Sequence, residues 1–124
     1  MANKAIIGVE SRGKIFAGLK DWAKSVDRGQ PVPEADYYLN FETAAMLFSE
    51  LTPQRMRTLE TLKQSGCQSI YALAKRLGRN YSNVHQDIAK LLEHGLVEKN
   101  KEGQVFVPWS AVEIHVALGE AKAA

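Results

Sequence analysis

The chain has a single cysteine, Cys67, among its 124 residues. One cysteine excludes a disulfide within the chain and a metal cluster built from cysteines. No apolar run approaches the ~18 residues that a membrane span needs, and the apolar stretch that follows Met1 is too short for a signal peptide. We therefore expect a cytoplasmic protein that does not enter the membrane.

Residue arrangements that carry enzyme chemistry are also missing. The sequence has no phosphate-binding glycine loop, no nucleophile elbow and no constellation of paired carboxylates. Its three histidines, His85, His94 and His115, do not have the H-x-x-x-H spacing of a helical metal site. We expect no enzyme activity, no metal and no cofactor.

Positive charge is concentrated in the middle of the chain. The net charge is only +2, but residues 52–109 hold nine Lys or Arg against five Asp or Glu, whereas residues 1–51 hold six against seven. A basic segment in an otherwise balanced chain favours a polyanionic partner.

Helix signals are strongest in this basic segment. Apolar residues at helical spacing predict helices over 15–26 and 43–51, and three more helices follow. Each of these three begins after a good N-cap residue and ends at a glycine. The predicted helices cover 53–65, 70–77 and 81–94, with caps at Thr52, Ser69 and Asn80 and stops at Gly66, Gly78 and Gly95.

Strand signals lie on both sides of the helices. Residues 4–9 predict a strand, and residues 37–41 form either a strand or the approach to a helix. Residues 96–107, with a glycine-containing loop, predict a β-hairpin. Period-two alternation favours a strand over 112–118, although the capping-box spacing of Ser110 and Glu113 leaves a helix open.

This order of elements predicts a mainly α, α+β fold, namely a winged helix-turn-helix with an N-terminal helical extension and a short β-hairpin wing. We expect residues 1–50 to form an extension used for dimerisation and residues 51–109 to form the DNA-binding domain. A C-terminal strand at 110–118 and a loose tail at 119–124 complete the chain.

The helix over 81–94 has two opposed faces. Its apolar side is predicted to face the core and contains Tyr81, Val84, Ile88, Leu91 and Leu92. Its other side carries short polar side chains of the kind that pair with base edges in a major groove. The predicted base-reading residues are Ser82, Asn83, Gln86 and Lys90.

Cations near this helix are predicted to contact DNA phosphates, which would position the domain without reading sequence. The predicted phosphate contacts are Lys75, Arg76, Arg79, His85, Lys99 and Lys101. For His85 a structural role at the surface is an equal alternative. Polar residues opposite an apolar stripe occur on any surface helix, so the DNA hypothesis depends on the ordered set of helices and hairpin.

A family resemblance adds to this pattern. Residues 51–109, and the segment that begins at Phe41, resemble a MarR-like winged-helix group of predicted prokaryotic transcriptional regulators, in particular a small family of haloarchaeal and bacterial DNA-binding proteins. The resemblance is carried by Leu51-Thr52-Pro53-Gln54-Arg55, Leu73-Ala74-Lys75-Arg76-Leu77-Gly78-Arg79-Asn80-Tyr81, Val84-His85-Gln86-Asp87 and Gly95-Leu96-Val97. In that group an Asp often stands at the position of Asn80, which caps a helix equally well but changes the local charge.

The resemblance implies a DNA-binding regulator that is usually dimeric. Some relatives in that group resemble antitoxins encoded beside a small toxin, so a cognate toxin is a second possible partner. We expect a homodimeric regulator of double-stranded DNA, acting as a repressor. The alternative is an antitoxin, or a winged helix that docks or scaffolds a partner protein.

Overall fold

The computed structural model describes residues 4–9 and 36–118. The expected helix over 15–26 and the tail at 119–124 lie outside these described residues. The described residues form an α+β structure with four helices and five strands, divided into two compact units. None of the described helices is long and apolar enough to cross a membrane.

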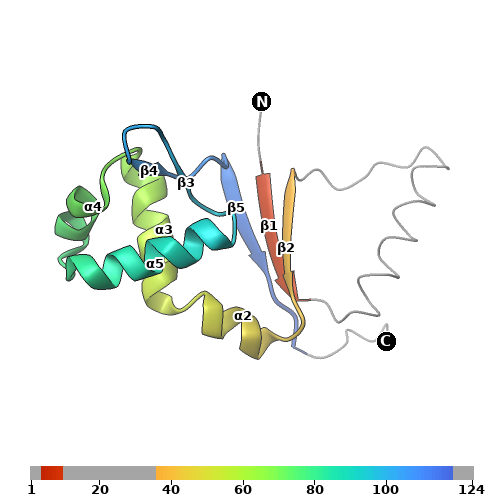
Figure 1. The fold of residues 1–124 in the computed structure, drawn as a ribbon. Helices are drawn as coiled ribbons and strands as arrows, with labels where there is room; N and C mark the ends of the chain where they lie inside the picture. The colour runs from red at the N-terminus through yellow and green to blue at the C-terminus, as the bar shows by residue number, and fades with distance from the viewer. Residues whose placement is uncertain (1–3, 10–35, 119–124) are drawn as a thin grey trace, which may run out of the picture. The chain divides into compact units, whose positions relative to one another are not determined.

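The first unit contains a three-stranded parallel sheet built from β1 (Lys4–Val9), β2 (Tyr37–Phe41) and β5 (Ala111–His115), in the order β2-β1-β5 (Figure 1). The strands predicted at 4–9 and 112–118 are confirmed, the latter ending earlier, and residues 37–41 adopt the strand alternative. The C-terminal strand β5 pairs with β1 and so belongs to this sheet.

Alternation along β1 separates an apolar face of this sheet from a polar face. Ile7 is opposite Leu39 on one side and Ile114 on the other, so these three side chains share a face, with Ile7 fully buried. On the other face Lys4 and Glu113 form an ion pair. The same alternation in β5, where Val112 and Ile114 alternate with Glu113 and His115, explains why period two predicted that strand.

The second unit, Phe48–Ser110, begins with the last residues of α2 (Ala44–Glu50) and continues with α3 (Pro53–Ser65), α4 (Ile70–Leu77) and α5 (Tyr81–Glu93). The three predicted N-caps are confirmed. Each cap side chain accepts a backbone N–H of the first turn, at 3.2 Å for Thr52, 3.1 Å for Ser69 and 2.8 Å for Asn80.

A short antiparallel hairpin follows α5, formed by β3 (Glu98–Lys99) and β4 (Val105–Phe106). Val105 also exchanges two backbone hydrogen bonds with Gln68, at 2.8 and 3.1 Å, just before α4 begins. The hairpin is therefore fixed to the start of α4, because β4 has a backbone partner on each side.

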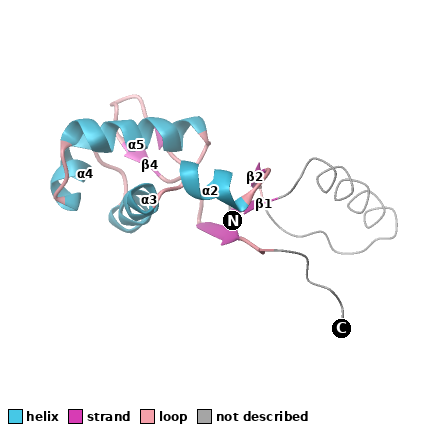
Figure 2. Cartoon of the chain, turned by 90° about the horizontal axis from the view of Figure 1, so that it is seen from below, coloured by secondary structure: helices cyan, strands magenta, loops and turns pink. Residues whose placement is uncertain are grey.

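The core of the second unit lies among its three long helices and the hairpin, and α5 packs against both α3 and α4 (Figure 2). Fully or almost fully buried side chains come from every one of these elements: Leu59, Leu62, Leu73, Leu77, Val84, Ile88, Leu91, Leu96, Val97 and Val105. Because α5 buries one side in this core, its opposite side faces outward.

Candidate functional site

The turn between α4 and α5 sets where α5 begins. Gly78 adopts a left-handed conformation (φ 66°, ψ 32°), and the N–H groups of Gly78 and Arg79 donate to the last carbonyls of α4 at 3.1 and 3.0 Å. Asn80 then caps α5. Two helices joined by so short a turn leave little freedom in the position of α5 relative to α4.

The outer face of α5 carries the residues predicted to read bases. Asn83 and Gln86 are exposed, and so is Ser82, whose hydroxyl donates to the Asn80 Oδ1 at 2.6 Å. Lys90 is 43% exposed and forms an ion pair with Glu93 at 3.5 Å. The helix therefore offers two primary amides that the protein does not bury, and their contact with DNA stays a prediction.

The inner face of α5 differs from the sequence prediction at two positions. Val84, Ile88 and Leu91 are buried as expected, but the prediction that Tyr81 faces the core was wrong, because 48% of that residue is exposed. Tyr81 stands at the first position of the helix, and its ring lies 5.8 Å from the ring of exposed His85. At the next turn Asp87 also lies on the buried side of the helix, and only 8% of it is exposed.

The second unit also carries exposed cations on α4 and on the hairpin. On α4, Lys75 lies 4.8 Å from the centre of the Tyr71 ring, and the Nε of Arg76 donates to Gln68 at 3.4 Å. Lys99 and Lys101 are exposed on the hairpin. All ten predicted site residues lie in the second unit.

The hairpin loop that carries Lys101 is ordered by the backbone and the side chain of Asn100. The Oδ1 of Asn100 accepts the backbone N–H groups of Glu102 and Gln104 at 3.0 and 2.9 Å. Such a side-chain-to-backbone turn holds the loop without tertiary packing. Lys101 is thus presented from a structured tip. Cys67 lies close by and is exposed, within 3.4 Å of the Asn100 amide nitrogen.

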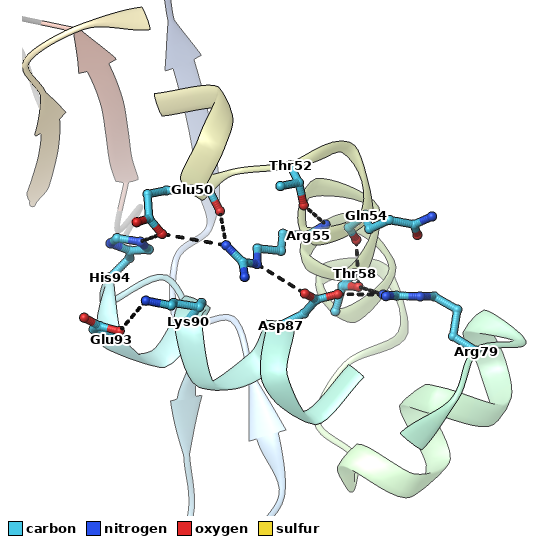
Figure 3. Close-up of polar contacts among 10 residues, drawn as sticks. All are labelled: Glu50, Thr52, Gln54, Arg55, Thr58, Arg79, Asp87, Lys90, Glu93 and His94. Atoms are coloured by element: carbon cyan, nitrogen blue, oxygen red, sulfur yellow. Dashed lines mark hydrogen bonds and ion pairs between the residues drawn. The ribbon is translucent and has the colours of Figure 1, made fainter. Parts of the chain in front are cut away.

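Arg79 has a different environment from the other predicted phosphate contacts. Its NH1 donates inward to Asp87 at 2.7 Å and to the Thr58 hydroxyl at 3.2 Å, and its side chain is only 18% exposed (Figure 3). The other carboxylate oxygen of Asp87 accepts the Nε of Arg55 at 3.2 Å. This Arg55–Asp87–Arg79 network was missed in the sequence.

One signal could have identified the network. Asp87 lies three residues after Val84 and four before Leu91, on the buried side of the helix, where a carboxylate needs a cationic partner. Arg55 lies in the first turn of α3, against which α5 packs, and Arg79 lies in the short turn just before α5. Their joint use of one carboxylate is a tertiary fact that periodicity does not reveal.

The C-terminal end of α5 is tied to the end of α2. The Nε2 of His94 lies 3.3 Å from Glu50 Oε2, and Arg55 NH1 donates to the Glu50 carbonyl at 2.9 Å (Figure 3). The hydrogen bond from His94, together with the nearby cations Lys90 and Arg55, holds the pKa of Glu50 below its ordinary value, although partial burial opposes this shift.

The polar face of the sheet in the first unit carries a second charged group. Lys4 and His115 both contact Glu113, with His115 Nε2 at 3.0 Å from Glu113 Oε1, and these two hydrogen bonds lower the pKa of the Glu113 carboxyl. These residues are partly or largely exposed, which is typical of a cross-strand ion pair.

Within residues 4–9 and 36–118, no three His, Cys, Asp or Glu side chains are grouped as metal ligands would be.

Comparison with known proteins identifies the family of this chain. Residues 50–114 match the HVO_A0114 family. No match was found among curated proteins or among solved structures. The matched residues, which include all of the second unit after its first two residues, make up more than half of the 124-residue chain. The chain therefore belongs to the HVO_A0114 family.

Proposed function

We propose that the second unit is a winged helix-turn-helix domain that binds double-stranded DNA in a sequence-specific manner. The proposal is carried by the exposure of Asn83 and Gln86 on the outer face of α5, a helix whose other face is buried in the core. Amide side chains pair bidentately with adenine in a major groove, which is wide enough for a helix. α4 and α5 then take the parts of the two helices of the motif, and the β3–β4 hairpin is its wing.

The charges around α5 support this assignment. Lys75 and Arg76 on α4, and Lys99 and Lys101 on the hairpin, are exposed, as cations that meet phosphates would be. The N-terminus of α5 adds a partial positive charge. A DNA complex held by such contacts weakens steeply as salt is raised.

The wider role follows from the domain and from the MarR-like resemblance of the sequence. We infer a homodimer that acts as a transcriptional repressor in the cytoplasm. A single recognition helix reads only a few base pairs, and a two-fold dimer doubles the site. In the first unit, β5 lies at an edge of the sheet, where a second copy of the chain has backbone groups to pair with.

The base-reading assignment is tested by replacing both amides. A duplex selected by the wild-type protein from a random pool serves as the specific target, and a scrambled duplex is the reference. Asn83→Ala and Gln86→Ala together should lower affinity for the selected duplex by about 1–3 kcal/mol for each bidentate pair lost, measured by fluorescence anisotropy. Affinity for the scrambled duplex should change little. Gln64→Ala, an exposed amide on α3, is the matched control.

The phosphate assignment predicts a different pattern. Lys101→Ala should weaken binding to both duplexes alike and make the dependence of log K on log salt shallower by about 0.9, the value of one phosphate contact. A wild-type protein that shows no salt-dependent duplex binding would contradict the proposal. In that case the alternative of an antitoxin or protein-docking winged helix would be favoured.

A further inference from the structure

Asp87 is the acidic residue on α5 that the protein buries. Only 8% of Asp87 is exposed, and each of its carboxylate oxygens accepts a hydrogen bond. Oδ1 accepts from Arg55 at 3.2 Å, and Oδ2 accepts from Arg79 at 2.7 Å. A carboxylate removed from water is tolerated only with such partners. The three side chains therefore form one charge-assisted hydrogen-bond network that joins α3, the turn before α5, and α5 itself (Figure 3).

Thr58 gives Arg79 a second inward anchor. Its hydroxyl accepts from Arg79 NH1 at 3.2 Å and donates to the Gln54 carbonyl at 2.8 Å, so the acceptor is itself held in place. Thr58 is completely buried. The guanidinium of Arg79 is thus directed into the domain by two partners on two different helices.

The location of Arg79 means that the direction of its side chain affects whether it can contact a DNA phosphate. Arg79 immediately precedes the N-cap of α5, which is where a helix presents its positive end to a phosphate. An arginine with a free side chain at this place would bind any DNA, because phosphate contacts carry no sequence information. Asp87 offers the same guanidinium an internal carboxylate instead.

We propose that Asp87 is a positioning residue for specificity, which withholds Arg79 from DNA phosphates and fixes the rotation of α5 about its axis. The withheld cation lowers binding to arbitrary sequences. The fixed rotation keeps Asn83 and Gln86 facing the bases, because Asp87 holds the buried side of the same helix in place. This inference rests on the DNA-binding function proposed above and names the residue that raises its selectivity.

The first test removes Arg79 and leaves Asp87 paired with Arg55. Arg79→Gln should leave the salt dependence of binding to a scrambled duplex unchanged, because the wild-type side chain does not contact phosphate. A slope that becomes shallower by about 0.9, the value of one phosphate contact, would show that Arg79 binds DNA directly and would overturn the proposal. The measurement is anisotropy across a salt series with the full chain.

The second test releases Arg79 instead of removing it. Asp87→Asn should make the slope for the scrambled duplex steeper by about 0.9 and lower the ratio of specific to non-specific affinity by about tenfold, a size typical of coupled networks. The double variant Asp87→Asn with Arg79→Gln should return the slope to the wild-type value while the ratio stays low. Glu60→Gln, which removes an exposed carboxylate from α3, is the matched charge control.

Circular dichroism melting shows whether each variant is folded at the temperature of the titration. A folded Asp87→Asn variant with wild-type slope and ratio would overturn the proposal, and if Asp87→Asn does not fold, the Arg79→Gln slope alone decides. A wild-type chain that binds no duplex would overturn the proposed function and this inference together. Duplex binding with a shallower Arg79→Gln slope would overturn the inference alone.

Discussion

Two glycines end helices of the second unit with different backbone conformations. Gly78 lies in the left-handed helical region, at φ 66° and ψ 32°, whereas Gly66 has φ 84° and ψ −170°. Left-handed helical angles are accessible to Asn and, at some cost, to other residues, but the region of Gly66 is essentially restricted to glycine. A methyl group at either position would meet nothing within 4 Å. The backbone alone therefore sets the cost of a substitution.

This difference predicts an order of stability. Gly66→Ala should lower the free energy of unfolding more than Gly78→Ala, with both losses in the range of about 1–3 kcal/mol, as measured by urea denaturation. Gly78→Asn should lose less than Gly78→Ala because Asn tolerates left-handed angles. Equal losses for the two alanine variants would contradict the backbone argument.

At the scale of elements, the end of α2 and the end of α5 are joined through Glu50 and His94. The carboxyl of Glu50 has a lowered pKa because it accepts a hydrogen bond from His94 and lies near two cations. A group whose pKa is lower in the folded than in the unfolded chain stabilises the fold above its unfolded pKa, about 4.3 for Glu. This stabilisation is lost as the pH falls through the lowered folded pKa.

The pH dependence of stability tests this connection. Wild-type stability should fall more steeply than that of Glu50→Gln between about pH 5 and pH 3, a window around the ordinary Glu pKa. At neutral pH the free energies of unfolding of wild type and Glu50→Gln should differ by less than about 1 kcal/mol, because a partly exposed pair contributes little to stability. Urea denaturation at each pH measures it, with Glu60→Gln as the control. Parallel curves for wild type and Glu50→Gln would refute the connection.

At the scale of the whole molecule, the two units have different architectures. The first is a parallel sheet in which β1 pairs with β2, which precedes the helices in the sequence, and with β5, which follows them. The second is a set of helices with a hairpin. Because the second unit, Phe48–Ser110, contains every proposed DNA contact, we propose that the sheet of the first unit serves self-association.

Self-association predicts the mass in solution. The full chain should elute from size-exclusion chromatography with light scattering as a dimer, twice its 13.8 kDa mass, at micromolar concentration and without DNA. A sheet edge favours pairing of two copies, and so does the proposed recognition helix, which by itself would read only a short site. A monomer across the whole concentration range would contradict the dimer and would leave the DNA contacts of one domain to act alone.

Local signals in the sequence determined most of the elements and their ends. Thr52, Ser69 and Asn80 act on N–H groups within three residues, and glycine acts on its own backbone, so helix boundaries could be predicted without knowing the fold. β-branched residues predicted β1, and periodicity predicted β5 and the apolar stripe of α5. The exposed amides of α5 followed from the same stripe, because the side opposite a buried face is outside.

Only the tertiary structure decided which distant groups meet. The sequence could not show that the C-terminal strand pairs with β1, since strand order depends on chain segments more than one hundred residues apart. It placed Tyr81 inside and Arg79 outside, whereas the structure exposes the first and turns the second toward Asp87 and Thr58. Side-chain direction at a helix start depends on the packing of other helices, which local pattern and propensity do not contain.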